Sequence, residues 1–284
     1  MNNILKFDTS FCLIQQIRLA HAICESKFLV SITPSEIYKL QNLKRKFRMH
    51  FVSSNEVLGG LSAHIEIDHT LPKTSIGAIH RPLVFPHAIT QYCKSIWNEA
   101  RPTRYTFTGL ITESRKLCLQ KFITNNVKTD SFQELDFETP FFKIRKRIFS
   151  LFGIDNSIRK EIGDLVICSS TRGRKYPEKS WDEGYYKELA ESAFVLCPSG
   201  DYVWSYRFFE AILCGAIPII EENCAAYEGF KFFYMHDMLK DTSYSRADAE
   251  YNYQLCLKRI TIPTPELNRE LEAIANSYAQ HENG

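Results

Sequence analysis

The stretch from Trp181 to Ile220 constrains the fold of this chain more than any other. Two short apolar runs, Ala193–Cys197 and Ala216–Ile220, are typical of buried strands. Helical spacing precedes the first run at Glu183–Glu191 and separates the two runs at Tyr206–Leu213. Helices that alternate with buried strands predict a mainly parallel sheet built from βαβ units, which is an α/β fold.

The same alternation extends over much of the remaining chain. The pattern pauses at Glu99–Pro102 and then restarts. We therefore predict a small α/β unit over residues 1–101, a second over 102–263, and a C-terminal helix within 264–284. The further strands that we expect are Lys27–Ile32, Phe47–Val52, Ser75–His80, Tyr105–Leu110 and Asp164–Ser169, and the further helices are Ser35–Arg45, Glu113–Phe122 and Thr264–Gln280.

Composition excludes several classes of protein. With 44% hydrophobic and 24% charged residues, the chain has enough apolar material for a sizeable core. A formal net charge of +2 lacks the strong positive footprint of a general nucleic-acid binder. The nine cysteines are dispersed without a CxxC pair, which argues against a disulfide framework or a zinc site and favours a reducing compartment.

No segment has the apolar length that a membrane-spanning helix needs, so we expect a soluble cytoplasmic protein. One basic amphipathic stretch, Lys143–Phe149, admits two interpretations. It is either a peripheral contact with an anionic membrane or a surface helix that buries its apolar side in its own unit.

The loop after Cys197 is the first candidate binding element. In open α/β sheets, ligands bind beyond the carboxyl ends of the strands, where Pro198–Asp201 would lie. Gly200 allows a ligand or another backbone to approach closely. The helix that begins near Ser205 would offer backbone N–H groups and a partial positive charge, which suit a phosphate.

Two charged residues on that helix extend the candidate site. Arg207 can bind phosphate oxygens through two parallel hydrogen bonds. Glu210 lies one turn further on the same side, where its carboxylate could accept hydrogen bonds from a ribose diol. The alternative is an ordinary surface ion pair between the two side chains.

This stretch resembles the nucleotide-sugar half of exostosin-family glycosyltransferases. Their motif is a strand that ends in Cys-Pro, a Gly loop, Ser-x-Arg-x-x-Glu-Ala, a small-residue turn and Ile-Pro. The corresponding residues here are Cys197, Pro198, Gly200, Ser205, Arg207, Glu210, Ala211, Gly215, Ile217 and Pro218. The resemblance implies that Arg207 contacts the diphosphate of the donor and that Glu210 contacts its ribose.

The resemblance also implies a fold and an activity. The fold would be GT-B-like, with two Rossmann-like units and the small N-terminal unit on the acceptor side. The activity would be transfer of a sugar, with inversion, from a nucleotide-sugar donor to a hydroxyl of a glycan acceptor, either a surface polysaccharide or a lipid-linked glycan.

Further donor-binding candidates follow the expected strands. Arg115 resembles a phosphate-side arginine of the family, and the alternative is a solvated helix residue. Arg172 belongs to a basic loop that would neutralise a diphosphate or remain solvated. The full expected donor-binding set is Gly109, Arg115, Arg172, Ser199, Gly200, Ser205, Arg207 and Glu210.

Direct displacement at the sugar requires a base that deprotonates the acceptor hydroxyl. We carry two candidates forward: Asp201 in the loop, which could instead cap that loop, and Asp68 on an alternating stretch, which could instead face solvent. The wider set of candidate bases is Asp8, His21, Glu56, Asp68, His69, His80, His87 and Asp201.

No Asp-x-Asp motif is evident, so we expect neither a metal nor a cofactor, with a helix N-terminus and arginines stabilising the leaving diphosphate. Three alternatives stay open. Asp201-Tyr202-Val203 also resembles fucosyltransferases that use a GDP-sugar, and a CMP-linked sugar acid is a more distant donor. The third is a non-catalytic glycan- or nucleotide-binding module that has kept the fold and lost the base.

Overall fold

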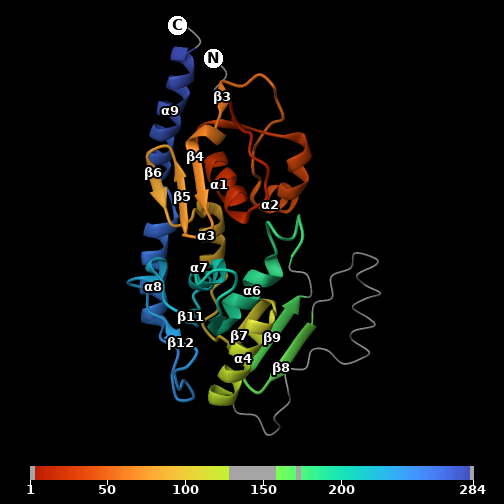
Figure 1. Cartoon of the computed structure of the whole chain (residues 1–284), viewed down its shortest axis with the longest axis vertical. Coiled ribbons are helices and arrows are strands. Elements are labelled where there is room, and N and C mark those ends of the chain that lie inside the picture. Colours follow the sequence, from red (N-terminus) through yellow and green to blue (C-terminus); the bar gives the residue numbers. More distant parts are fainter. Residues whose placement is uncertain (1–3, 128–157, 171–173, 282–284) are drawn as a thin grey trace, which may run out of the picture. The chain divides into compact units, whose positions relative to one another are not determined.

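A computed structural model describes residues 4–127, 158–170 and 174–281 (Figure 1). It is an α/β protein, as the sequence predicts, with helices packed on sheets that are largely parallel. The basic stretch Lys143–Phe149 lies outside the described residues. Within the described residues, no helix combines the length and the apolar character needed to span a membrane.

Contacts divide the chain into two units. Unit 1 comprises residues 1–92, 175–182 and 255–284, and unit 2 comprises residues 93–174 and 183–254. The division falls within two helices, α3 (His87–Ser95) and α8 (Arg246–Ile260). A division by contacts does not locate functional domains, so the boundaries at residues 101 and 263 stay a prediction.

Unit 1 begins with a βαβ element. Strands β1 (Ile4–Phe7) and β2 (Leu29–Ile32) pair in parallel and are connected through helix α1 (Ile14–Cys24). The short β3 (Gly59–Gly60) pairs on the other side of β1. The core residues of this layer include Leu5, Phe7, Ile17, Leu19 and Val30, all at most 1% exposed.

The segment after β2 corrects two sequence expectations. A 3-10 helix over Pro34–Leu40 leads directly into α2 (Gln41–Phe47), so the helical region begins at Pro34 and not at Ser35, with proline at its first position. The expected strand at Phe47–Val52 is wrong. Arg48 adopts a left-handed conformation (φ 51°) that ends α2, and only Val52 forms a bridge to the first sheet.

The expected single strand at Ser75–His80 is also wrong, because the chain reverses at Gly77 (φ 53°). The result is an antiparallel sheet of β4 (Ile65–Asp68), β5 (Lys73–Ile76) and β6 (Ile79–Arg81), preceded by a 3-10 turn, η2 (Ser62–His64).

Helix α9 (Thr264–His281) confirms the predicted C-terminal helix and lies beside the antiparallel sheet (Figure 1). Arg81 binds both carboxylate oxygens of Glu266 at 2.9 and 3.0 Å. Glu270 accepts the N–H of Ala78 at 2.7 Å. These contacts tie the end of the chain to a hairpin nearly two hundred positions earlier.

Helix α1 contains a buried histidine, His21, from which we predict that the protein is less stable at acidic pH. His21 is 2% exposed, and burial together with Arg18 lowers its pKa from 6.5 to about 3. The folded protein therefore contains the neutral imidazole. Because the unfolded chain binds a proton at this ring below pH 6.5 and the folded protein does not, the free energy of unfolding is highest above pH 6.5 and falls as the pH decreases toward 3. We expect wild type to lose about 1.5 kcal/mol between pH 6.5 and 5 relative to His21→Gln, measured by urea unfolding at each pH. Equal pH dependence of the two proteins would contradict this assignment.

Unit 2 is built on one six-stranded sheet. The strand order is β12-β11-β10-β7-β9-β8, and every neighbouring pair is parallel except β8 with β9. The strands are β7 (Thr103–Leu110), β8 (Ile158–Ile162), β9 (Leu165–Ser170), β10 (Ser192–Cys197), β11 (Ile217–Ile220) and β12 (Phe233–Tyr234).

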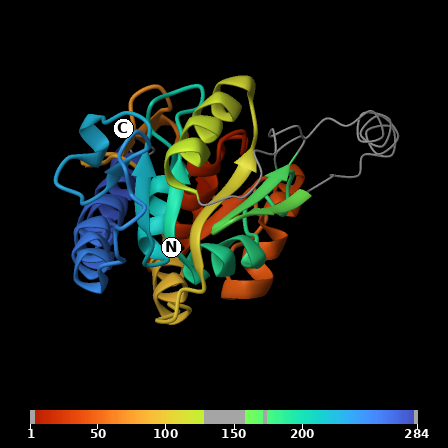
Figure 2. The ribbon, with the colours of Figure 1, turned by 90° about the horizontal axis from the view of Figure 1, so that it is seen from below.

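Helices cover both faces of this sheet (Figure 2). Helix α4 (Glu113–Asn126) packs Leu119 and Phe122 into the buried cluster on one face, and α6 (Glu183–Glu191) and α7 (Tyr206–Leu213) lie on the opposite face. A short 3-10 turn, η3 (Ala225–Tyr227), precedes β12.

Strand β7 lies between β9 and β10 in the sheet. After β7 the chain forms β8 and β9 on one side of it, and then crosses to form β10 on the other side. The region beyond the carboxyl ends of β7 and β10 is therefore the topological switch point, where open α/β sheets bind ligands.

The elements predicted for Trp181–Ile220 are confirmed, and α7 has the predicted bounds. Gly215 ends α7 in a left-handed conformation (φ 77°), as expected. Pro218 lies at the entry of β11, one residue before its pairing with β12 begins at Ile219, which avoids a demand for its missing N–H.

Candidate functional site

The candidate site lies at the switch point of unit 2. Four segments contribute to it: the end of β7, the first turn of α4, the loop after β10, and the first turn of α7. Gly109 is the second-last residue of β7, and Ser199 and Gly200 follow β10, so the expected residues lie where the topology places a ligand.

Arg115 extends from α4 to the loop after β10. Its Nε donates to the carbonyl of Ser199 at 3.0 Å, and its Nη1 donates to the carbonyl of Leu110 at 3.0 Å. Its Nη2 lies against the α-carbon of Gly200, where a methyl group would overlap it. The guanidinium is thus fixed by two backbone carbonyls, one at the end of β7 and one in the loop after β10.

Arg207 occupies the matching position from α7. Its Nε donates to the carbonyl of Thr108 at 2.8 Å, and its guanidinium lies 4.6 Å from the ring centroid of Phe107. Its Nη2 lies against Gly109, whose φ of 153° and close neighbour both favour glycine. Nη1 is buried and has no hydrogen-bond partner among the described residues, so it is a donor available to an anion.

The two guanidiniums influence each other electrostatically. Burial and the charge of Arg207 both lower the pKa of Arg115, while Asp201 and Glu221 act in the opposite direction. Like charges that interact in this way are stabilised when an anion binds near both of them. The site is therefore suited to a group with several negative oxygens.

Glu210 is buried, at 3% exposed, which excludes the surface ion pair considered from the sequence. The hydroxyl of Tyr185 donates to its Oε2 at 2.7 Å, and the hydroxyl of Tyr186 donates to its Oε1 at 3.1 Å. Both tyrosines come from α6, so this carboxylate joins α6 to α7. Sequence reasoning missed the two tyrosines because their contact with Glu210 depends on how the helices pack.

Ser205 precedes α7 as expected, but its side chain makes no cap hydrogen bond to the helix. Its backbone N–H donates to the hydroxyl of Tyr227 at 2.7 Å. One backbone donor of this helix start is therefore already used inside the protein, which leaves fewer free N–H groups there than the sequence predicts. Arg172 lies outside the described residues.

Two carboxylates interact with Arg115. Asp201 is exposed in the loop after β10 and interacts with Arg115. Glu221 follows β11 directly, and its Oε2 accepts the N–H of Ser199 at 3.1 Å. Sequence reasoning missed Glu221, although its place just after a predicted strand is the same signal that led to Ser199.

Asp68 ends β4 in unit 1. It accepts hydrogen bonds from the Thr70 hydroxyl at 2.7 Å and from the N–H groups of Thr70 and Leu71 at 2.8 and 3.2 Å. These bonds, with the Thr70 hydroxyl first, lower the pKa of Asp68. The geometry favours a turn-capping role, and a lowered pKa weakens a carboxylate as a base, so its catalytic assignment stays a prediction.

The other candidate bases in unit 1 also have local roles. Asp8 accepts both the N–H and the hydroxyl of Ser62, at 3.0 and 2.8 Å. His80 contacts the hydroxyl of Ser75 at 2.7 Å, and His69 contacts Gln15 at 3.3 Å. Glu56 is exposed.

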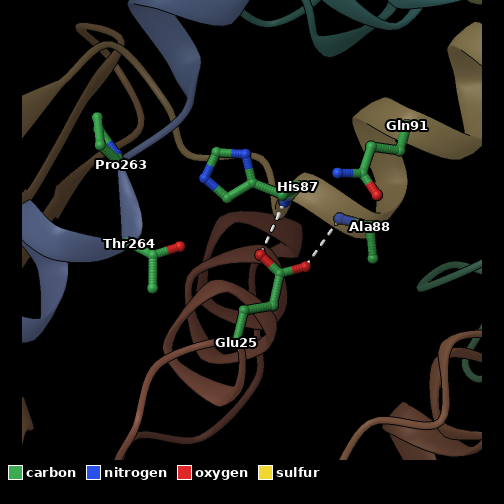
Figure 3. A pocket seen from close by; sticks show the side chains of 6 residues that line it. All are labelled: Glu25, His87, Ala88, Gln91, Pro263 and Thr264. Carbon is green, nitrogen blue, oxygen red and sulfur yellow. Dashed lines mark hydrogen bonds between the residues drawn. The ribbon is translucent and has the colours of Figure 1, made fainter.

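Unit 1 also contains a pocket of about 480 Å³. Glu25 is one of the residues that line it, and its two carboxylate oxygens accept the N–H groups of His87 and Ala88 at 2.8 Å each (Figure 3). Burial raises the pKa of Glu25. His87 in turn contacts the carbonyl of Ile262 at 2.9 Å through Nε2. These contacts give Glu25 the role of a cap for α3. The residues that line the pocket are Glu25, His87, Ala88, Gln91, Pro263 and Thr264.

Comparisons with known proteins agree with this geometry. The family model of the exostosin GT47 domain matches residues 66–227, which is more than half of the chain. A probable glucuronosyltransferase of rice, Oryza sativa subsp. japonica, is 39% identical over 62 residues. That match covers 22% of this chain and 14% of the relative, so the chain spans only a small part of that protein. The chain belongs to the exostosin family of GT47 glycosyltransferases.

Proposed function

We propose that this protein transfers a sugar from a nucleotide-sugar donor to a hydroxyl of a glycan acceptor, such as a surface polysaccharide or a lipid-linked glycan. The observation that carries this proposal is the pair of guanidiniums, Arg115 and Arg207, at the switch point of unit 2. Arg115 is fixed by two backbone carbonyls and Arg207 by one, and each lies against a glycine, so both can contact one diphosphate.

The arginines would act mainly on the leaving group. As the bond between the sugar and the diphosphate breaks, negative charge grows on the diphosphate oxygens, and fixed cations stabilise that charge without reorganisation. Arg207 offers its unpartnered Nη1, and Glu210 would accept hydrogen bonds from the ribose. Asp201 is the favoured base for the acceptor hydroxyl because it interacts with Arg115, and the reaction would proceed with inversion.

Metal independence is part of the proposal. Arginines at this position supply the charge that a divalent cation supplies in other transferases. Among the described residues, no group of three or more His, Cys, Asp or Glu side chains is arranged to hold a metal. Activity that disappears with a chelator and returns with Mn²⁺ would contradict this part.

The test of the function is release of free nucleotide across a panel of UDP-, GDP- and CMP-sugars, with isolated glycans as acceptors. Because the rice relative is named a probable glucuronosyltransferase, a UDP-linked glucuronic acid is the first donor to try. Acceptor-dependent release with one donor would support transfer. Binding of a nucleotide without any release would favour the non-catalytic module, and release from a GDP-sugar alone would favour the fucosyltransferase-like alternative.

The glycine beneath Arg115 gives a separate prediction. Gly200→Ala should weaken the binding of the preferred nucleoside diphosphate by about 10-fold, because the added methyl group overlaps the Arg115 guanidinium and displaces it. Isothermal titration calorimetry would measure the change. In an Arg115→Ala background the same substitution should have almost no further effect, and full additivity would contradict a role through Arg115.

Two further properties belong to the proposal. The two units would form a GT-B-like enzyme whose unit 1 binds the acceptor. The protein would work in the cytoplasm, in peripheral contact with a membrane where its acceptor is lipid-linked, and it would bind no nucleic acid.

A further inference from the structure

Helix α2 and the residues that follow it form a basic surface in unit 1. Between Glu36 and Glu56 the chain contains no acidic residue. Within this interval, five exposed basic side chains lie close together in the sequence. They are called here the α2 basic surface and comprise Lys44, Arg45, Lys46, Arg48 and His50. Helix α2 lies at the edge of unit 1 that is opposite α9 (Figure 1).

Much of the positive charge on this surface has no carboxylate partner. Among the described residues, Lys44, Arg45 and Arg48 form no ion pair. The Nζ of Lys44 lies 4.8 Å from the ring centroid of Phe51, and the Nη2 of Arg45 donates to the side-chain oxygen of Asn42 at 3.1 Å. Cations at neighbouring positions repel one another, so a negatively charged partner stabilises them.

The shape of the surface favours a broad partner over a ligand in a cleft. Leu43 is the buried residue of α2, and the next three residues are cations. Successive helical positions differ by about 100° in direction, so these cations spread over the outer sides of the helix. The pocket of unit 1 is lined by other residues.

Aromatic rings accompany the cations. Tyr38, in the 3-10 helix just before α2, is 48% exposed, and Phe51 is half-buried beside Lys44. Basic side chains next to aromatic rings are typical of proteins that bind at the headgroup level of a membrane. This combination favours a lipid surface over a soluble polyanion.

We propose that the α2 basic surface binds the anionic headgroups of a membrane. The proposal names the surface that makes the membrane contact in the proposed function, on which it rests. A cluster of four Lys and Arg residues is sufficient for recognition of anionic lipid. Because no acyl chain is part of this contact, the binding is reversible and sensitive to salt.

The test is sedimentation of the full chain with lipid vesicles. One set contains phosphatidylcholine alone, and the other contains phosphatidylcholine and phosphatidylserine at about two to one. Wild type should bind the anionic vesicles at least about 100-fold more tightly than the neutral ones at about 0.1 M salt. The preference should largely disappear at about 1 M salt, where the Debye length falls to about 3 Å.

A charge-removal variant makes the test specific to this surface. It combines Lys44→Gln, Arg45→Gln, Lys46→Gln and Arg48→Asn, because asparagine tolerates the left-handed φ of 51° at position 48. Its affinity for anionic vesicles should fall by about 100-fold. If circular dichroism shows that this variant is unfolded, Lys44→Gln with Arg45→Gln alone should still lower the affinity by about 10-fold.

The matched control removes four exposed lysines that lie outside the surface. Its formal net charge is −2, from +2 minus 4, and is therefore the same as that of the charge-removal variant. Its affinity for anionic vesicles should stay within about 3-fold of wild type. The four control substitutions are Lys121→Gln, Lys187→Gln, Lys240→Gln and Lys258→Gln.

The outcomes separate this surface from the function on which it rests. Equal binding to both vesicle types, or an unchanged preference in the charge-removal variant, overturns the proposal. Binding to soluble polygalacturonate in place of the vesicles also overturns it and assigns the surface to an anionic glycan. If vesicle binding fails while nucleotide release with a soluble acceptor persists, sugar transfer stands without this membrane contact. If release fails while the vesicles bind, the surface stands and the transfer function is wrong.

Discussion

Replacement of Arg207 by alanine should weaken the binding of the preferred nucleoside diphosphate by about 100-fold or more. The substitution removes a buried donor, Nη1, and one of two cations that would share the diphosphate charge. Charge-assisted hydrogen bonds contribute about 1.5–3 kcal/mol each, and two of them correspond to at least a 100-fold change in affinity. Calorimetric titration with UDP and GDP would measure the effect.

Two variants make this result specific. Arg207→Lys keeps the charge but not the planar fork, so it should recover only part of the affinity. Arg246→Ala removes an exposed arginine of the same unit, which lies 4.5 Å from the ring centroid of Trp97, and it should leave the affinity unchanged. Equal affinities of wild type and Arg207→Ala would show that the diphosphate does not bind at Arg207.

The sequence predicts the part of the site that depends on local order. Ser199 and Gly200 were found because they follow an apolar strand, and strand ends gather at one edge of a parallel sheet. Arg207 and Glu210 were found because helical spacing puts them one turn apart. Their surroundings were not predictable, because the partners Thr108 and Tyr185 come from other elements and are brought near only by packing.

The errors in unit 1 have a similar origin. Ser75–His80 has the composition of one strand, but a single glycine with positive φ turns it into a hairpin. The apolar residues of Phe47–Val52 suggest a strand, yet Arg48 breaks the helix and leaves only Val52 paired. Composition predicts how a segment would be buried, whereas one backbone torsion decides the direction in which the chain continues.

Arg101 was assigned from the sequence only to a pause between units, but the structure gives it a large part in the stability of unit 2. It is 7% exposed, and its Nη1 donates to the carbonyls of Ala190 and Ser192 at 3.1 and 2.6 Å. Its Nη2 donates to the carbonyl of Cys214 at 3.0 Å. One cation thus binds carbonyls at the carboxyl ends of both α6 and α7, where the helix dipoles favour positive charge.

Arg101→Met should lower the free energy of unfolding by about 4 kcal/mol, because three buried carbonyls lose a charged donor at once. Arg101→Lys should lose a smaller amount, since an ammonium cannot span all three acceptors in the same plane. Urea unfolding followed by circular dichroism would measure both variants, with Arg246→Ala as a control expected to change by less than 1 kcal/mol.

A loss below 1 kcal/mol for Arg101→Met would show that the three carbonyls find other donors. A large loss of stability would also give a reason for the glycine that follows α7, since this position must leave room for Arg101. Gly215 has a φ of 77°, and a methyl group there would overlap the Arg101 guanidinium. Arg101 joins the ends of the two helices that carry Tyr185 and Glu210. Its removal should therefore also weaken the hydrogen bond between these two side chains.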